Sequence, residues 1–478
     1  MNEIWVPQAL AALFLLLPLL RAFVERLRTL EGIAWLPFLA LGILAIMFPA
    51  YGFRIEAVPI LAFALVYSVL SLVALIAGKT ARDGEPRSAA REASRPRAIV
   101  GIVFLAICAT PMFAFAPRAL PESAAFGPGA RSIAVSGGEY VLRVFGDAES
   151  GRPIIFIVPP DLGSAASIEL VSQSLSEKGF TVVTYSSRSG DAIFINEKGR
   201  TRARPTRLWR NWFLETRLTE SAAVNARRVE LEAARKSEIE YLLPRLPALL
   251  GVADGNLPAI LFVGYDSGGS ALAWMAGDNG FLARNAPTLG AVAIGSKLWS
   301  SYRIAPRAIE PLTDSGRLTR LRTNIGNWFA GLSAQRVSRT GSLPEAGLPI
   351  LYLVSGRAFD EGRRQTAYQA VFDALEASAG PAAIVGIEGA GPFDYQDFPF
   401  TQPVLSFLFP GLSGAQRSVR PIDDTAAIIG NFASRLLEIR AEWGAPVLPA
   451  LPQGAIPAHS AITVPLRVES QGMPWLRL

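Results

Sequence analysis

The apolar residues of the chain are concentrated in its first quarter, where they form four almost continuous runs. Each run has about 19 to 21 residues, long enough as a helix to cross roughly 30 Å of hydrocarbon. No run has an ionisable residue near its centre, and none shows the polar face of a helix packed in a protein core. The pattern predicts four transmembrane helices, at residues 4–24, 33–53, 57–77 and 98–116.

Basic residues flank these runs unevenly. Nine lie in the loops after the first run and before the fourth, namely Arg21, Arg26, Arg28, Lys79, Arg82, Arg87, Arg91, Arg95 and Arg97. Only Arg54 and Arg118 lie on the other sides. Because basic loops stay in the cytoplasm, everything after Ala116 should lie outside it. The first run lacks a basic n-region and a cleavage site, so we expect a retained helix in a multi-pass protein of a prokaryotic cytoplasmic membrane.

After residue 130 the pattern changes to short apolar runs that alternate with helical stretches. Strands are predicted at 132–135, 140–145, 153–158, 180–185, 259–263, 289–294, 349–354 and 383–387. Helices are predicted at 165–177, 219–250, 361–378 and 422–443, the second broken near Pro244 and Pro247. Such alternation indicates an α/β fold, with a mainly parallel sheet covered by helices on both faces.

The domain organisation follows from these changes of pattern. We expect a four-helix transmembrane domain at 1–120, an α/β domain at 132–443 and a proline-rich tail at 444–478. Segments 196–218 and 298–344 interrupt the alternation. They could form a cap over the carboxyl ends of the strands, where open α/β sheets place their sites, or they could be surface decoration.

Charge and cysteine content exclude several classes of function. The net charge is +6, but residues 1–120 carry +4 of it, so the imbalance mainly reflects membrane topology. No basic stripe with interleaved aromatic residues is present, and we expect no nucleic-acid partner. The only cysteine, Cys108, lies in the fourth apolar run, which leaves the α/β part without disulfides or cysteine metal sites. We expect no cofactor.

A glycine-framed turn joins the strand at 259–263 to a helix rich in small residues. Its sequence Gly264-Tyr-Asp266-Ser-Gly268 has the form G-x-Nu-x-G of a nucleophile elbow. Glycines suit this turn because a strand that reverses into a helix brings backbone against backbone. The nucleophile position is occupied by Asp266.

With this elbow among the alternating strands, residues 132–443 resemble the α/β-hydrolase superfamily. The chain is most similar to lipase-like and platelet-activating-factor-acetylhydrolase-like members, on the stretch 388–395 and the following Asp397-Phe398-Pro399. The resemblance implies an α/β-hydrolase fold after the four transmembrane helices. It also implies a nucleophile at the elbow, a base on the turn after the last strand and an acid after the preceding strand.

The residues at these positions depart from the superfamily pattern. Haloalkane dehalogenases and epoxide hydrolases use an aspartate as Asp266 would be used, although Asp is also a favoured helix cap. Ser267 is out of register for attack, but its backbone N–H could face an oxyanion. Asp360 stands at the acid position and could instead cap a helix. At the base position stands Pro392, which has no titratable group.

Two further positions bear on catalysis. Asp161 lies on the oxyanion loop, where its carboxylate would repel the charge that such a loop must stabilise. His459 is the only histidine, about 67 residues beyond the base position, and its imidazole could in principle reach back. A pocket of Asp161, Asp266 and Asp394 could bind a cation, although no metal-ligand spacing supports it.

These departures favour a membrane-anchored pseudo-hydrolase that binds an unidentified small-molecule or protein ligand. The alternative is an active hydrolase of esters, epoxides or halides, with Asp266 as nucleophile and an unrecognised base. Transport through the helices is a third hypothesis, which the absence of ionisable residues at mid-membrane argues against. The lipid bilayer is the expected partner of the four helices.

Overall fold

The computed structural model describes residues 5–28, 30–51, 57–80, 95–114, 130–146, 152–160, 165–191, 193–195, 201–203, 222–253, 256–277, 281–298, 302–304, 337–339, 347–359, 368–378, 380–390, 395, 420–442, 457–463 and 465–476. The chain forms two compact units. The first, the helical unit, comprises Met1–Ala119 with Thr201–Ala203 and Phe400–Leu408. The second, the α/β unit, comprises the remaining residues.

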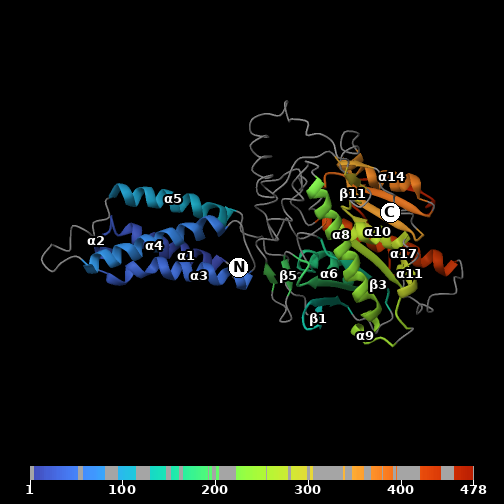
Figure 1. Ribbon diagram of the computed structural model, residues 1–478, viewed down its shortest axis with the longest axis horizontal. Helices are drawn as coiled ribbons and strands as arrows, with labels where there is room; N and C mark the ends of the chain where they lie inside the picture. The colour runs from blue at the N-terminus through green and yellow to red at the C-terminus, as the bar shows by residue number, and fades with distance from the viewer. Residues whose placement is uncertain are drawn as a thin grey trace, which may run out of the picture. The chain divides into compact units, whose positions relative to one another are not determined.

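In the helical unit each of the four apolar runs is helical, as the sequence predicts (Figure 1). The elements are α1 (Trp5–Leu20), α2 (Glu25–Arg28), η1 (Glu31–Trp35), α3 (Leu36–Tyr51), α4 (Val58–Thr80) and α5 (Arg95–Ala114). Among the described residues, one segment, Val58–Ile76 of α4, is long and apolar enough to cross a membrane. The apolar segments Pro7–Leu20 and Gly32–Met47 are shorter, and the chain turns after Leu20.

The interior of the helical unit is built from alanines and leucines. Ala11, Leu15, Ala40, Leu44, Ile60 and Ala64 are all buried to at least 99 %. Two polar side chains, Gln8 and Ser68, are also buried there. Small residues let helices approach closely. The larger apolar side chains of α4 and α5 are left on the outer surface, among them Val66, Val73 and Val100.

The α/β unit is organised around a nine-stranded sheet with the order β1-β2-β4-β3-β7-β8-β11-β12-β13. Its strands are β1 (Ala130–Val135), β2 (Tyr140–Phe145), β3 (Ile154–Val158), β4 (Thr181–Ser187), β7 (Ile260–Tyr265), β8 (Thr288–Ile294), β11 (Ile350–Ser355), β12 (Ala382–Ile387) and β13 (Leu466–Gln471). Strands β4, β3, β7, β8, β11 and β12 run parallel, and β2 and β13 are antiparallel to their neighbours. This mixed sheet fits the α/β-hydrolase fold.

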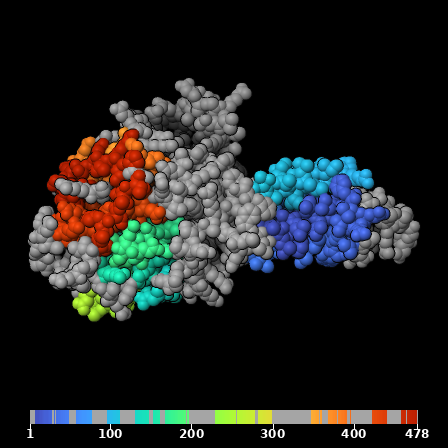
Figure 2. All heavy atoms as spheres, turned by 180° about the vertical axis from the view of Figure 1, so that it is seen from behind, coloured from blue at the N-terminus to red at the C-terminus, as the bar shows by residue number. Residues whose placement is uncertain are grey.

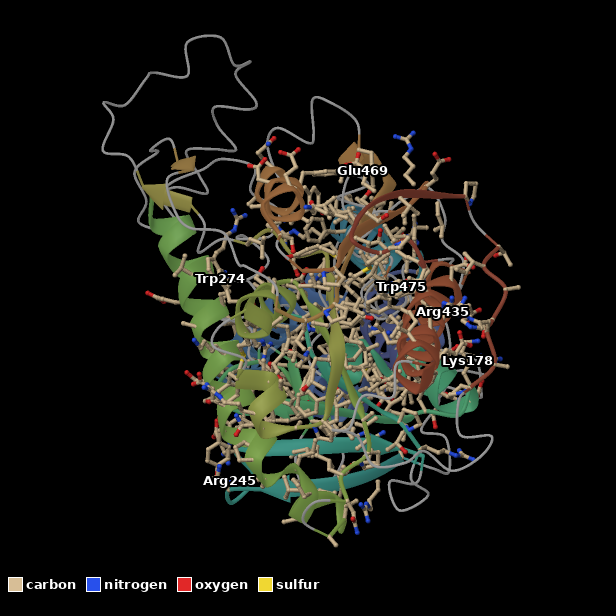
Figure 3. The ribbon with its side chains drawn as sticks, turned by 90° about the vertical axis from the view of Figure 1, so that its right-hand side faces the viewer. Lys178, Arg245, Trp274, Arg435, Glu469 and Trp475 are labelled. Atoms are coloured by element: carbon tan, nitrogen blue, oxygen red, sulfur yellow. The ribbon has the colours of Figure 1, made fainter. Side chains whose placement is uncertain are left out.

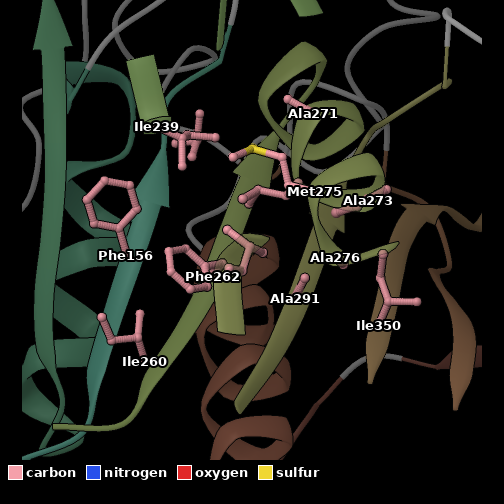
Figure 4. Packing of buried hydrophobic residues seen from close by; sticks show 14 of the residues in the cluster. Phe156, Ile239, Ile260, Phe262, Ala271, Ala273, Met275, Ala276, Ala291 and Ile350 are labelled. Carbon is pink, nitrogen blue, oxygen red and sulfur yellow. The ribbon is translucent and has the colours of Figure 1, made fainter. Parts of the chain in front are cut away.

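The parallel strands are buried on both faces, which explains why they read as continuous apolar runs. Helices α8 (Ala222–Leu242), α9 (Leu246–Leu250), α10 (Ser267–Gly277), α11 (Phe281–Asn285) and α14 (Gln369–Ala377) belong with one apolar core. There Phe156 and Phe262 of the sheet pack near Met275 of α10 (Figure 4). The short η6 (Leu243–Arg245) lies between α8 and α9, where the prolines predict a break in the helix.

Helices α6 (Glu169–Glu177) and α17 (Arg420–Glu442) pack against each other and lie side by side in Figure 2, where they are green and red. The connection from β3 to β4 runs toward one edge of the sheet, and the connection from β7 to β8 runs toward the other edge. Because such crossovers are right-handed, α6 and α10 lie on opposite faces of the sheet. Figure 3 accordingly shows Trp274 of α10 and Arg435 of α17 on opposite sides of the unit.

The expectation of a separate tail from residue 444 does not hold for β13, which is the ninth strand of the sheet. It pairs antiparallel with β12, from Ile387 opposite Leu466 to Ala382 opposite Gln471. All six residues Leu466–Gln471 are at least partly exposed, as befits a strand at the edge of the sheet.

The two segments predicted as a cap lie mostly outside the described residues. Within or beside them the structure has three-residue strands, β6 (Thr201–Ala203), β9 (Tyr302–Ile304) and β10 (Val337–Arg339), and β9 pairs antiparallel with β10. The remaining short elements are β5 (Ile193–Ile195), η5 (Ala165–Ser167) and η8 (Gly356–Phe359).

Candidate functional site

Asp266 stands alone between β7 and α10, at the carboxyl edge of the central strands. Its φ of 50° lies in the left-handed region, which non-glycine residues seldom adopt. Its N–H donates to the carbonyl of Ile294 in β8 at 2.9 Å, which holds the turn in place. The glycine pattern therefore predicted the strand-to-helix turn correctly. A strained non-glycine residue at such a turn is a reason to look for a function.

Three glycines make this turn sterically feasible. A Cβ on Gly264 would lie 2.5 Å from the backbone of Gly268 and of Gly269, where α10 crosses the end of β7. A Cβ on Gly268 would lie 2.6 Å from Cγ1 of Val158, at the end of β3. A Cβ on Gly269 would collide with the hydroxyl of Ser296. The backbone of the elbow is thus packed against side chains at the ends of β3 and β8.

The backbone carbonyl of Asp266 is used within the turn. The residue is partly exposed, but its Oδ2 atom is buried. The carbonyl accepts from the N–H of Ser270 at 3.1 Å and from the hydroxyl of Ser296 at 3.1 Å. Oδ1 lies over Gly295, whose added Cβ would be 3.2 Å away. The buried Ser267 opens α10, so the carboxylate sits at a helix amino terminus, where the helix dipole stabilises a negative charge.

A buried ionic network borders the loop that follows β3. The Arg235 guanidinium of α8 donates to Asp191 at 2.8 Å, to Glu238 at 2.8 Å and to the carbonyl of Pro160 at 3.2 Å. Glu238 also accepts from the hydroxyl of Tyr185 in β4 at 2.9 Å. Arg235 therefore ties the start of the predicted oxyanion loop to α8 and to the turn after β4.

Burial raises the pKa of Asp191 to about 7, against the opposing effect of the Arg235 guanidinium. A raised carboxyl pKa at a sheet edge is a usual mark of a general base. Here, however, Asp191 is completely buried, one oxygen accepts from Arg235, and the other accepts from the N–H of Ser187 at 2.8 Å. Both oxygens are committed to the network, so Asp191 serves the structure of the loop rather than a proton transfer.

His459 lies on the other side of the sheet from the elbow. Its Nε2 is 3.0 Å from Oε1 of Glu438 in α17, the helix that packs with α6. Hydrogen bonds from Arg435 and His459 lower the pKa of Glu438 despite its partial burial. The imidazole is therefore engaged at the outer face of α17 and does not approach Asp266 of α10.

The other predicted site residues, Asp161, Asp360, Pro392 and Asp394, lie outside the described residues. The residues that border the 391–394 segment are described. The carbonyl of Ala390 accepts from the Ser355 hydroxyl at 2.5 Å, and the Tyr395 hydroxyl donates to the carbonyl of Val354 at 2.5 Å. Both ends of that segment are thus anchored at the carboxyl end of β11, two strands from the elbow.

Within the described part of the chain, no group of three or more His, Cys, Asp or Glu residues could hold a metal ion. The residues that the sequence analysis missed are those of the ionic network. Their signal was the regular spacing of Arg228, Glu232, Arg235 and Glu238, which places four charges of mixed sign on one face of α8, and all four are buried.

Comparison with known proteins gives one family match at the start of the chain and several similar solved structures. Residues 2–114 match the family model TP_0976_N, described as an N-terminal domain. No curated protein matches the chain.

Among solved structures, a ferulic acid esterase from Streptomyces cinnamoneus is similar at 12 % identity and a TM-score of 0.39, over 67 % of this chain and 88 % of that one. Esterase 2 from Thermogutta terrifontis is similar at 15 % identity and a TM-score of 0.32, over 70 % and 99 %. The fold rests on the sheet order and the elbow, because likenesses at these TM-scores carry no argument.

Proposed function

We propose that the chain is a membrane-anchored pseudo-hydrolase, which keeps an α/β-hydrolase scaffold in order to bind a ligand or a partner. The observation that carries this proposal is the separation of Asp266 from the only imidazole of the chain. Asp266 occupies the elbow at α10, whereas His459 is hydrogen-bonded to Glu438 of α17.

Catalysis at such an elbow needs a base as well as a nucleophile. If Asp266 attacked a substrate carbon, the resulting aspartyl ester would have to be hydrolysed by a water molecule that a base activates. General-base catalysis contributes typically 10²- to 10⁴-fold. Pro392 stands at the base position, and among the described residues Asp191 is committed to Arg235 and His459 to Glu438.

The alternative is an active hydrolase with Asp266 as nucleophile, and one observation favours it. Asp266 holds a positive φ that an ordinary helix cap does not need, and the residue is partly exposed at the helix amino terminus. Ester, epoxide and halide substrates would all fit an attacking carboxylate. Asp161 and Asp360 would then act at the oxyanion and acid positions that the resemblance gives them.

The full-length protein in detergent micelles should be assayed on short-chain esters, epoxides and alkyl halides. We expect wild type to hydrolyse them no faster than Asp266→Ala. Pro392→His combined with Asp266→Ser should recover more ester hydrolysis than either change alone, because catalytic residues act as a unit. Wild-type turnover that disappears in Asp266→Ala would establish the active hydrolase instead.

Mass spectrometry separates a third outcome. An alkyl group trapped on Asp266 without turnover would mean that the nucleophile works and only the base is missing. Asp266→Asn is the matched control, because it keeps the size of the side chain and removes the attacking charge. A protein that gains no mass with any of the three substrate classes fits the ligand-binding proposal.

For the first quarter of the chain we propose a membrane anchor of four helices. It is supported by the apolar outer surface of α4 and α5 and by the alanine-rich interior of the helical unit. The shorter α1 and α3 would cross with the apolar residues that flank them, such as Phe23 and Val24.

The nine-to-two distribution of basic residues orients this anchor with the α/β unit outside the cytoplasm. Fusion of alkaline phosphatase after Pro128 should give an active phosphatase, and fusion after Arg91 should give an inactive one. Fluorescence of a cytoplasm-only reporter fused after Pro128 would overturn the orientation.

A further inference from the structure

Strand β13 lies at the end of the sheet, and no described strand pairs with its outer edge. Its Val468 is 47 % exposed and is the one exposed large apolar residue among the described residues of the α/β unit. Figure 3 shows its neighbour Glu469 at the margin of that unit. An uncovered edge strand is a template for another strand, and folds usually cover or block it.

The hydrogen bonds to β12 determine which backbone groups of β13 point outward. The N–H of Glu388 donates to the carbonyl of Pro465 at 3.1 Å, so residues 388 and 465 face each other as a hydrogen-bonded pair. In an antiparallel ladder bonded and non-bonded pairs alternate. Residues 467, 469 and 471 are therefore bonded to β12, and Leu466, Val468 and Ser470 direct their N–H and C=O groups to the outer edge.

A second β13 strand can satisfy these outward groups in antiparallel orientation. The outward groups pair with each other in three overlapping registers. Pairing of residue 466 with 468 places Arg467 opposite its own copy, and pairing of 468 with 470 places Glu469 opposite its own copy. Like charges directly opposite are destabilising. When Val468 faces Val468, Arg467 faces Glu469 in both directions.

We propose that two copies of the chain associate through β13, with a twofold axis at Val468. The two sheets then join into one. The interface is isologous, because both copies contribute the same strand. Val468 meets its copy on one face, and two Arg467–Glu469 pairs form on the other. Arg467 also has an ion pair with Glu388 at 2.9 Å within its own chain. The opposite edge strand, β1, has a single charged residue, Arg131, and offers no such complement.

Proline gives a selective test, because it removes a single N–H. The N–H of Val468 points outward, so Val468→Pro leaves the bonds to β12 in place and blocks the new pairing. Val468→Ala keeps the N–H and is the matched control. Light scattering of the full-length protein in detergent should give two copies per particle for wild type and Val468→Ala, and one for Val468→Pro.

Cysteine crosslinking tests the register. In a Cys108→Ala background, Val468→Cys should form an intermolecular disulfide on oxidation, because bonded antiparallel partners have Cα atoms about 5.5 Å apart. Leu466→Cys alone should not, because its copies are offset by four residues, roughly 14 Å. Leu466→Cys with Ser470→Cys should crosslink again.

Charge reversal tests the pairing of side chains. Arg467→Glu and Glu469→Arg should each weaken dimerisation several-fold, and the double swap should restore most of it. Glu388→Gln should leave the dimer unchanged. The proposal is overturned if wild type is monomeric, or if Val468→Pro remains dimeric and Val468→Cys does not crosslink, since the association would then lie elsewhere.

Discussion

The helical unit and the α/β unit differ in how many large apolar side chains they expose. Among the described residues, 21 large apolar side chains are exposed, and 20 of them belong to the helical unit. Both units have an apolar interior. It is built from small and branched side chains such as Ala11 and Leu15 in the helical unit, and from whole apolar strands such as Ile154–Val158 in the α/β unit.

The membrane anchor proposed above would place the two units in two different solvents. A unit in water gains stability by removing apolar area from contact with water. A helical bundle in hydrocarbon gains little in that way, and it associates through small residues and polar contacts. The two units should therefore respond differently to the same kind of substitution.

The largest effect is expected where backbones touch in the α/β unit. Gly264→Ala places a Cβ 2.5 Å from the backbone of α10, which cannot move aside without displacing the helix. It should destabilise the α/β unit by about 4 kcal/mol or more, at the extreme of single substitutions. Gly42→Ala in α3 is the matched control, because its Cβ meets nothing within 4 Å. Protease resistance of each unit on heating measures both, and equal losses would contradict the comparison.

A somewhat smaller loss is expected from Arg235→Met. The change leaves Asp191 and Glu238 buried without their cation, at a cost of roughly 3–5 kcal/mol. The adjacent Lys236→Met removes a surface contact with Glu240 at 4.0 Å, and such a contact is worth about 0–1 kcal/mol. Urea unfolding of the detergent-solubilised protein separates the two. Similar midpoints would show that the buried network is not important for stability.

In the helical unit the sharpest test is a charge on the outer surface of α4. Leu70 is 59 % exposed, so Leu70→Asp would be nearly neutral in water. In hydrocarbon it should make the free energy of membrane insertion of the helix less favourable by about 3 kcal/mol. A glycosylation reporter for membrane insertion measures this. Val468→Asp in dilute protein is the control, and it should change the unfolding free energy by less than roughly 0.5 kcal/mol.

The smallest effect is a pH dependence of the α/β unit. Asp191 has a pKa of about 7 when folded, against 3.8 for the ordinary group, so the folded state binds the proton more tightly. Its contribution is complete below about pH 3.8 and is lost as the pH rises through about 7. Between pH 5.5 and 8 the unfolding free energy should therefore fall with rising pH. Asp191→Asn should flatten the profile, and an unchanged slope would assign it to another group.

The elements that depend on local pattern could be predicted from the sequence. The four apolar helices, most strands and the turn at Asp266 follow from run length, alternation and glycine spacing. The pairing of β13 with β12 could not, because a strand of mixed polarity gives no sign of its partner some 80 residues away. The spacing of the charges on α8 marks one face of that helix, but it does not show that Arg235 is buried, since only the folded chain brings Asp191 to it.

The glycines of the elbow have a consequence for how such a motif is interpreted. Gly264, Gly268 and Gly269 are required by the crossing of α10 over β7, β3 and β8, whichever residue occupies position 266. The glycine pattern therefore indicates how a strand and a helix pack at this turn, and it does not indicate which reaction takes place there. A search by motif would find this chain among enzymes even if it had lost all catalytic activity. Only the residue between the glycines and its distant partners can distinguish an active enzyme from an inactive scaffold.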